Sequence, residues 1–175
     1  DAEDNTFQTK EELQKAVDDW TSANPADHVE VIKKYGDINT WKVGNITDMA
    51  KLFQDKDKFN DDISRWDVSN VTNMQSMFQN ANNFNQNLGE WNISNVVSMD
   101  NMFEGCHALT NNPNPDDSSW PYWSINDEKD SEEDLSPRKK GWLENWDKAQ
   151  GKEGEKGLTK CKNFDNMFLG CINLK

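Results

Sequence analysis

Large apolar residues recur along the chain with a period of 25 residues. The segments 41–53, 66–78 and 91–103 read WKVGNITDMAKLF, WDVSNVTNMQSMF and WNISNVVSMDNMF. In the first copy the recurring apolar positions are Ile38, Trp41, Val43, Ile46, Met49, Leu52, Phe53 and Phe59. The residues between them are mostly polar. A fixed period of this length is typical of a solenoid, in which each coil buries its apolar side against its neighbours.

The spacing inside one repeat predicts the shape of a coil. Trp66 and Val68 alternate with polar residues, which favours a short strand with one face inward. From Val71 the apolar positions follow at intervals that match the stripe of a short helix, and Ser69 is placed to cap its first amides. The sequence therefore predicts an α/β solenoid with right-handed, leucine-rich-repeat-like coils. Each coil would contain a short parallel strand, a turn, a short helix and a loop.

The segment before the repeats follows a different pattern. Thr9 and Glu12 form a capping box in front of one helix, and a second short helix is indicated between Asn24 and Gly36. We expect residues 1–37 to form a helical cap over the first coil, whose core would otherwise face water. Residues 38–175 would then form the solenoid.

The last part of the chain contains an interrupted repeat. The tail CKNFDNMFLGCINL, residues 161–174, matches VVSMDNMFEGCHAL, residues 96–109. This match predicts about four coils, the fourth interrupted by an insertion at about 126–157. Insertions in solenoids usually form loops on one face.

The insertion and the residues just before it are rich in aromatic side chains. This aromatic surface either packs on the flank of the solenoid or binds a protein or glycan partner, because exposed aromatic rings suit both. The candidate partner-binding residues are Trp120, Tyr122, Trp123, Trp142, Leu143 and Trp146.

Three asparagines, Asn45, Asn70 and Asn95, share one position of the repeat. Their side-chain amides can donate and accept along the stack, which predicts a structural asparagine ladder. Glycosylation is the alternative, because NIT and NVT at this column are acceptor sequons, as is NIS at Asn92. We expect ladder residues to be buried and free of glycans. Asn92 stands between two inward residues, should point outward, and is the better acceptor.

Two further groups of side chains raise chemical alternatives. The run QDKDKFNDD is either a solvated turn or a weak calcium site, because it lacks the glycine and the glutamate of an EF-hand. Its carboxylates belong to Asp55, Asp57, Asp61 and Asp62. Cys106 and Cys171 share one repeat position, so a disulfide between them is an alternative to buried thiols. Cys161 should face the core, and a bridge between Cys161 and Cys171 is the less favoured pairing.

Charge and motifs narrow the class of protein. The net charge is −13, which argues against nucleic acid and anionic membrane surfaces. No apolar run approaches the roughly 20 residues that span a bilayer. The two histidines stand apart in the sequence, and no catalytic motif is present. We therefore expect no enzyme, no cofactor and no tightly bound metal.

The repeats resemble those of BspA-like surface proteins, relatives of leucine-rich repeats that are also described as mycoplasma-type lipoprotein repeats. The resemblance rests on YGDINTWKVGNITDMAKLF, FNDDISRWDVSNVTNMQSMF and FNQNLGEWNISNVVSMDNMF, and it covers about residues 5–110 and 158–175. It implies a secreted or cell-surface module for adhesion or partner binding, with a protein or glycan as partner. The alternative is a structural scaffold subunit of a larger assembly, extracellular or in an organelle lumen.

Overall fold

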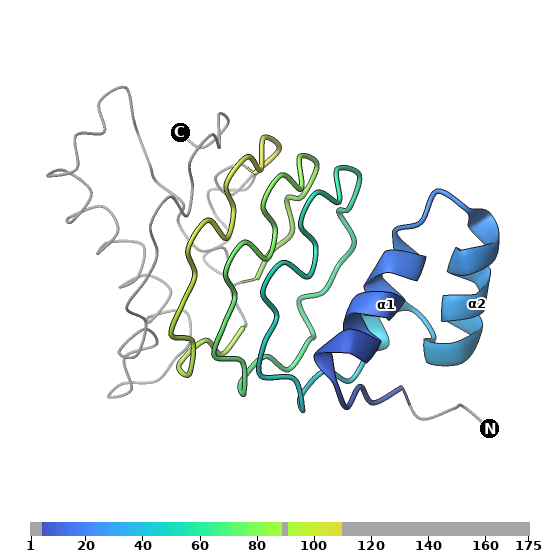
Figure 1. The fold of residues 1–175 in the computed structure, drawn as a ribbon, viewed down its shortest axis with the longest axis horizontal. Helices are drawn as coiled ribbons and strands as arrows, with labels where there is room; N and C mark the ends of the chain where they lie inside the picture. Colours follow the sequence, from blue (N-terminus) through green and yellow to red (C-terminus); the bar gives the residue numbers. More distant parts are fainter. Residues whose placement is uncertain (1–4, 89–90, 110–175) are drawn as a thin grey trace, which may run out of the picture.

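A computed structural model describes residues 5–88 and 91–109 of the chain. Two α-helices, α1 (Lys10–Trp20) and α2 (Pro25–Tyr35), are followed by a short 3-10 helix, η1 (Ile38–Thr40). Figure 1 shows the two helices at one end of the described part, with α1 between α2 and the first coil. The chain then runs through coils that lie side by side, coloured from cyan to yellow. The fourth coil and the insertion at about 126–157 that the sequence predicts lie outside the described residues.

The helix ends follow the expected capping residues. The Thr9 hydroxyl accepts a hydrogen bond from the backbone N–H of Glu12 at 3.2 Å, and the Glu12 carboxylate accepts one from the backbone N–H of Gln8 at 3.1 Å. Helix α2 begins after Asn24, whose side chain accepts from the backbone N–H of Ala26, and it has proline at its first position. Both helices predicted for this segment are therefore present.

Helix α1 covers the N-terminal side of the first coil. The Lys10 ammonium lies 3.0 Å from a carboxylate oxygen of Asp48, and the Gln14 amide donates to the backbone carbonyl of Leu52 at 3.0 Å. The apolar face of α1 joins the same core cluster as the coils through Leu13, Ala16 and Val17. The helix thus shields apolar surface and supplies a donor to a carbonyl that no preceding coil can reach.

Backbone hydrogen bonds join successive coils in a constant register. The N–H of Met49 donates to the carbonyl of Asn73 at 2.9 Å, and the N–H of Met74 donates to the carbonyl of Ser98 at 2.9 Å. Parallel bridges connect Asp48 to Asn73 and Asn73 to Ser98. The bridged residues are separated by the full sequence repeat, and each N–H donates to the carbonyl one residue before its own equivalent in the next coil. Equivalent residues of neighbouring coils therefore lie above one another.

Within each coil, alternate amides take a different partner. The N–H of Met49 leaves the coil, whereas the N–H of Leu52 returns to the Met49 carbonyl at 3.3 Å and that of Gln54 to the Lys51 carbonyl at 3.1 Å. This alternation uses residues with positive φ, among them Lys51 at 63° and Ser76 at 53°. Half of the amides therefore close local turns and half join the coils, which satisfies both sets.

The coils differ in detail from the expected strand and helix. In the described coils no helix follows Val71, and Trp66 and Val68 lie in no strand. The apolar spacing after Val71 comes from consecutive three-residue turns, which place side chains inward at nearly the same intervals as a helix. The expected elements were wrong because spacing alone does not say where the backbone amides donate.

The core consists of columns of like side chains. Phe53, Phe78 and Phe103 stack with ring centroids 5.4 and 5.5 Å apart and planes within 1° of parallel. The tryptophan column is also held by hydrogen bonds. The indole N–H of Trp66 donates to the buried carbonyl of Ile38 at 2.8 Å, and that of Trp91 donates equivalently to Ile63 at 3.1 Å. A buried indole N–H needs an acceptor, and these carbonyls supply it.

Candidate functional site

The asparagine column bridges successive coils at their turns. The Asn70 side-chain amide donates to the Gly44 carbonyl at 2.7 Å, and the Asn95 amide donates to the Ser69 carbonyl at 2.7 Å. The structure thus gives these side chains inter-coil hydrogen bonds. Asn70 is exposed, however, and Asn95 is half-buried. The expectation that the column is buried was wrong, because these amides donate from the outside of the turn.

We expected Asn92 to be more exposed than the sequon asparagines of the column, Asn45 and Asn70, and the structure shows the opposite. Asn45 is exposed and its amide donates to the side chain of Gln8 at 3.2 Å. Asn92 is half-buried, and its side-chain oxygen accepts from the backbone N–H of Ser94 at 3.1 Å. The reason for preferring Asn92 over the column does not hold. Glycosylation of Asn92 stays a prediction.

The four aspartates of the first coil do not converge on a common site. Each carboxylate accepts a hydrogen bond from a different partner: Asp55 from Asn80, Asp57 from Asn82, Asp61 from Trp20 and Asp62 from Ser64. Within residues 5–88 and 91–109, no three His, Cys, Asp or Glu side chains form a group that could hold a metal ion. The hydrogen bonds from Ser64, backbone first, hold the pKa of Asp62 below its usual range.

Cys106 is the one cysteine that the structure places. It is buried, and its Sγ lies 3.0 Å from the carbonyl oxygen of Phe78. Its proposed disulfide partner, Cys171, and the third cysteine, Cys161, lie outside the described residues. The disulfide stays a prediction.

The aromatic partner-binding residues also fall outside the described part. They are Trp120, Tyr122, Trp123, Trp142, Leu143 and Trp146. Their role stays a prediction.

The outer surface contains side-chain ladders that we did not predict. The Gln54 amide donates to the Gln79 side-chain oxygen at 2.6 Å, and the Gln79 amide donates to the Glu104 carboxylate at 2.5 Å. The signal was present in the repeat, because these three polar residues share one position. The sequence analysis missed this ladder because it assumed that the polar positions between the apolar ones contact only water.

The described side chains offer little for acid–base chemistry. Ser76 is the buried polar side chain of this part of the chain, at 4% exposure. His107 is exposed, and His28 is half-buried with its Nδ1 2.8 Å from the Trp20 carbonyl. Because a carbonyl only accepts, this nitrogen of His28 carries a proton. No described carboxylate or imidazole has the deep burial that tunes a general acid or base.

The geometry defines a class of protein in which a helical hairpin covers a stack of coils with polar ladders outside and aromatic columns inside. Residues 26–146 match the family described as "Mycoplasma protein of unknown function, DUF285", and the chain belongs to this family. No curated protein and no solved structure matches the chain. None of the helices in the described residues has the length and apolar character needed to cross a membrane.

Proposed function

We propose that the chain is a non-catalytic binding or adhesion module on a leucine-rich-repeat-like solenoid, secreted or displayed at the cell surface, with a protein or glycan as its partner. The observation that carries this proposal is the set of outer polar ladders, such as Gln54–Gln79–Glu104. The ladders hold recognition groups on a framework of stacked coils and backbone hydrogen bonds.

Ordered side chains favour binding for an energetic reason. Immobilising a flexible side chain at an interface costs about 0.5–1.5 kcal/mol. Side chains already held by neighbouring coils, such as Asn80 against Asp55 at 2.8 Å, have lost part of this freedom before a partner arrives. A surface of this kind suits recognition better than chemistry, because its charged groups lie in water.

The second candidate is a scaffold subunit of a larger assembly, extracellular or in an organelle lumen. It is favoured by the outer face of α2. Val29 is 59% exposed and Ile32 is 42% exposed, and their spacing places them on one side of the helix. Exposed apolar side chains on a very polar chain are typical of protein contacts.

Light scattering on native material, with identification of the chains that purify with it, separates the two. A monomer that binds a purified partner reversibly supports the module, and an obligate complex supports the scaffold. For the scaffold, Val29→Ser with Ile32→Ser should release the partner, whereas the matched control Glu30→Ser on the same helix should not. A chain that binds nothing in either form contradicts both.

The aromatic set of the insertion is tested in the same assay. Trp142→Ser and Trp146→Ser should weaken partner binding and leave the melting temperature unchanged if these side chains contact the partner. A lowered melting temperature with unchanged binding would assign them to internal packing instead.

A further inference from the structure

Helix α2 carries apolar side chains on two different faces. Its buried residues, Val31 and Tyr35, face the rest of the described fold, and the Tyr35 hydroxyl donates to the Glu12 carboxylate of α1 at 3.1 Å. Val29 and Ile32 are exposed on the other face, and we call this pair the outer stripe. A surface helix needs one apolar stripe to pack on its own domain. The outer stripe is not needed for that packing and suits a contact with another chain.

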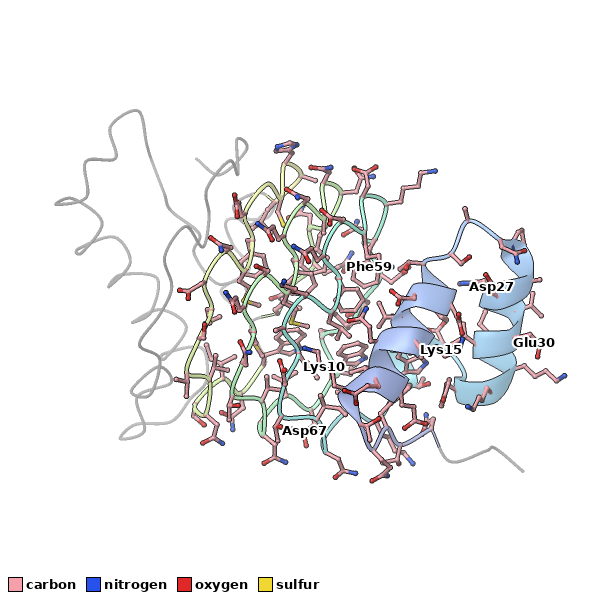
Figure 2. The ribbon with its side chains drawn as sticks, in the orientation of Figure 1. Lys10, Lys15, Asp27, Glu30, Phe59 and Asp67 are labelled. Atoms are coloured by element: carbon pink, nitrogen blue, oxygen red, sulfur yellow. The ribbon has the colours of Figure 1, made fainter. Side chains whose placement is uncertain are left out.

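Two side chains of opposite charge, Glu30 and Lys33, lie beside the outer stripe. Both are exposed, and within residues 5–88 and 91–109 neither makes an ion pair or a side-chain hydrogen bond, although their spacing of three residues places them on one side of the helix. Figure 2 labels Glu30 on the side of α2 that faces away from α1. Asp27 and Lys34, by contrast, already have partners within the chain. The two charges left for another molecule are therefore those next to the outer stripe.

This pattern of charges is complementary to itself when one helix is reversed. In an antiparallel pair related by a two-fold axis, the flank that carries Glu30 and Lys33 meets the same flank of the other copy in the opposite order. Glu30 of each copy then faces Lys33 of the other, and the two outer stripes meet between these ion pairs. A parallel pair would instead place Glu30 level with Glu30. We propose that the outer stripe of α2 binds the outer stripe of a second copy of this chain, with the two helices antiparallel.

The size of the helix sets the strength of this contact. Helix α2 has 11 residues and is therefore about 16 Å long. Two such helices bury less than the roughly 1,600 Å² of a standard interface, so we expect a reversible dimer with a Kd on the order of 0.1 mM. This inference rests on the scaffold candidate of the proposed function, and it names a second copy of the chain as the molecule that α2 contacts. In Figure 1, α1 separates α2 from the coils, so the dimer leaves the coil surfaces free for another partner.

Sedimentation equilibrium of the full chain, at concentrations from about 5 to 500 µM, tests the proposal. Glu30→Lys and Lys33→Glu should each weaken the dimer about 5–20-fold, because each change turns two attractive contacts into two repulsive ones. An equimolar mixture of these two variants should regain the affinity of the unsubstituted chain, since the like charges of one variant face the opposite charges of the other. The matched control is Glu11→Lys, which makes the same change in net charge at an exposed position of α1 and should leave the dimer unchanged.

Three results overturn the inference: a monomer at every concentration, a dimer that Val29→Ser with Ile32→Ser leaves intact, or a mixture of the two charge variants that associates no more tightly than either alone. A monomer that purifies with an unlike chain removes this inference and leaves the scaffold candidate standing. A dimer that these changes disrupt, in a chain that binds nothing else, supports the inference and counts against the binding module. Melting curves of the charge variants in dilute solution should coincide with that of the unsubstituted chain, because both side chains are exposed.

Discussion

Replacing Trp66 with phenylalanine isolates one buried hydrogen bond between coils. Trp66 is 3% exposed, and its ring lies 6.2 Å from that of Trp41 and 5.7 Å from that of Phe53. Its indole N–H donates to the Ile38 carbonyl at 2.8 Å. Phenylalanine keeps an aromatic ring in the column but removes the donor and part of the ring volume.

The expected loss of stability follows from these contacts. Without the indole donor the Ile38 carbonyl keeps only the longer hydrogen bond from the backbone N–H of Trp41, at 3.3 Å. The lost bond costs about 0.5–1.5 kcal/mol. The space left by the smaller ring adds about 1 kcal/mol, less than the roughly 3–5 kcal/mol expected for truncating Trp66 to alanine. We therefore expect Trp66→Phe to lower the free energy of unfolding by about 1.5–2.5 kcal/mol. For a chain of this length this corresponds to a decrease in Tm of about 3–10 °C.

Guanidinium denaturation followed by circular dichroism measures the loss, and Trp20→Phe is its control. The indole of Trp20 also donates a hydrogen bond, to the Asp61 carboxylate at 2.9 Å, but it does so at an exposed site. Its loss should cost less than about 1 kcal/mol, because water replaces the missing partner. If Trp66→Phe costs no more than Trp20→Phe, the buried inter-coil bond does not contribute as argued.

Four further predictions concern single positions. Gly105→Ala should destabilise by about 1–3 kcal/mol in thermal melts, because φ is +72° and the new Cβ would lie 2.6 Å from the side-chain oxygen of Asn80; a neutral outcome would contradict this geometry. Ser76→Gly should stabilise by about 0.5–1.5 kcal/mol, because glycine adopts the positive φ of this position without strain and because the change removes a buried hydroxyl with no partner in the described residues. Destabilisation would mean that the hydroxyl is used. Asn70→Asp should destabilise more than Asn70→Ala, because a carboxylate would face a carbonyl acceptor at the distance of the present 2.7 Å bond, and the reverse order in melts would refute the ladder. Because its pKa is lowered in the folded chain, Asp62 stabilises the fold at pH values above the usual carboxyl range, and this stabilisation is lost as the pH falls through the lowered pKa. The Tm difference between wild type and Asp62→Asn should therefore close in acid, and a difference that widens there would contradict the lowered pKa.

The core positions were accessible from sequence because they repeat. Every apolar position aligned across the three copies is buried, from Ile38 in the first coil to Leu109 in the third. The helix boundaries were also accessible, since Thr9, Asn24 and Gly36 act on neighbouring amides through local geometry. Burial in a periodic chain and capping at a helix end are both decided by residues close in sequence or repeated in it.

The path of the backbone inside a coil was decided by the tertiary structure. Inward side chains every three residues are compatible with a helix and with consecutive turns, and only the neighbouring coil selects between them. It does so by accepting the N–H of Met49 and its equivalents, which requires positive φ at residues such as Lys51 that have no local preference for it. The same stacking places Asn70 on the outside of its turn and joins Gln54 to Gln79. Side chains one repeat apart meet only after the coils have stacked. Their hydrogen bonds therefore cannot be predicted from the spacing of residues within one coil.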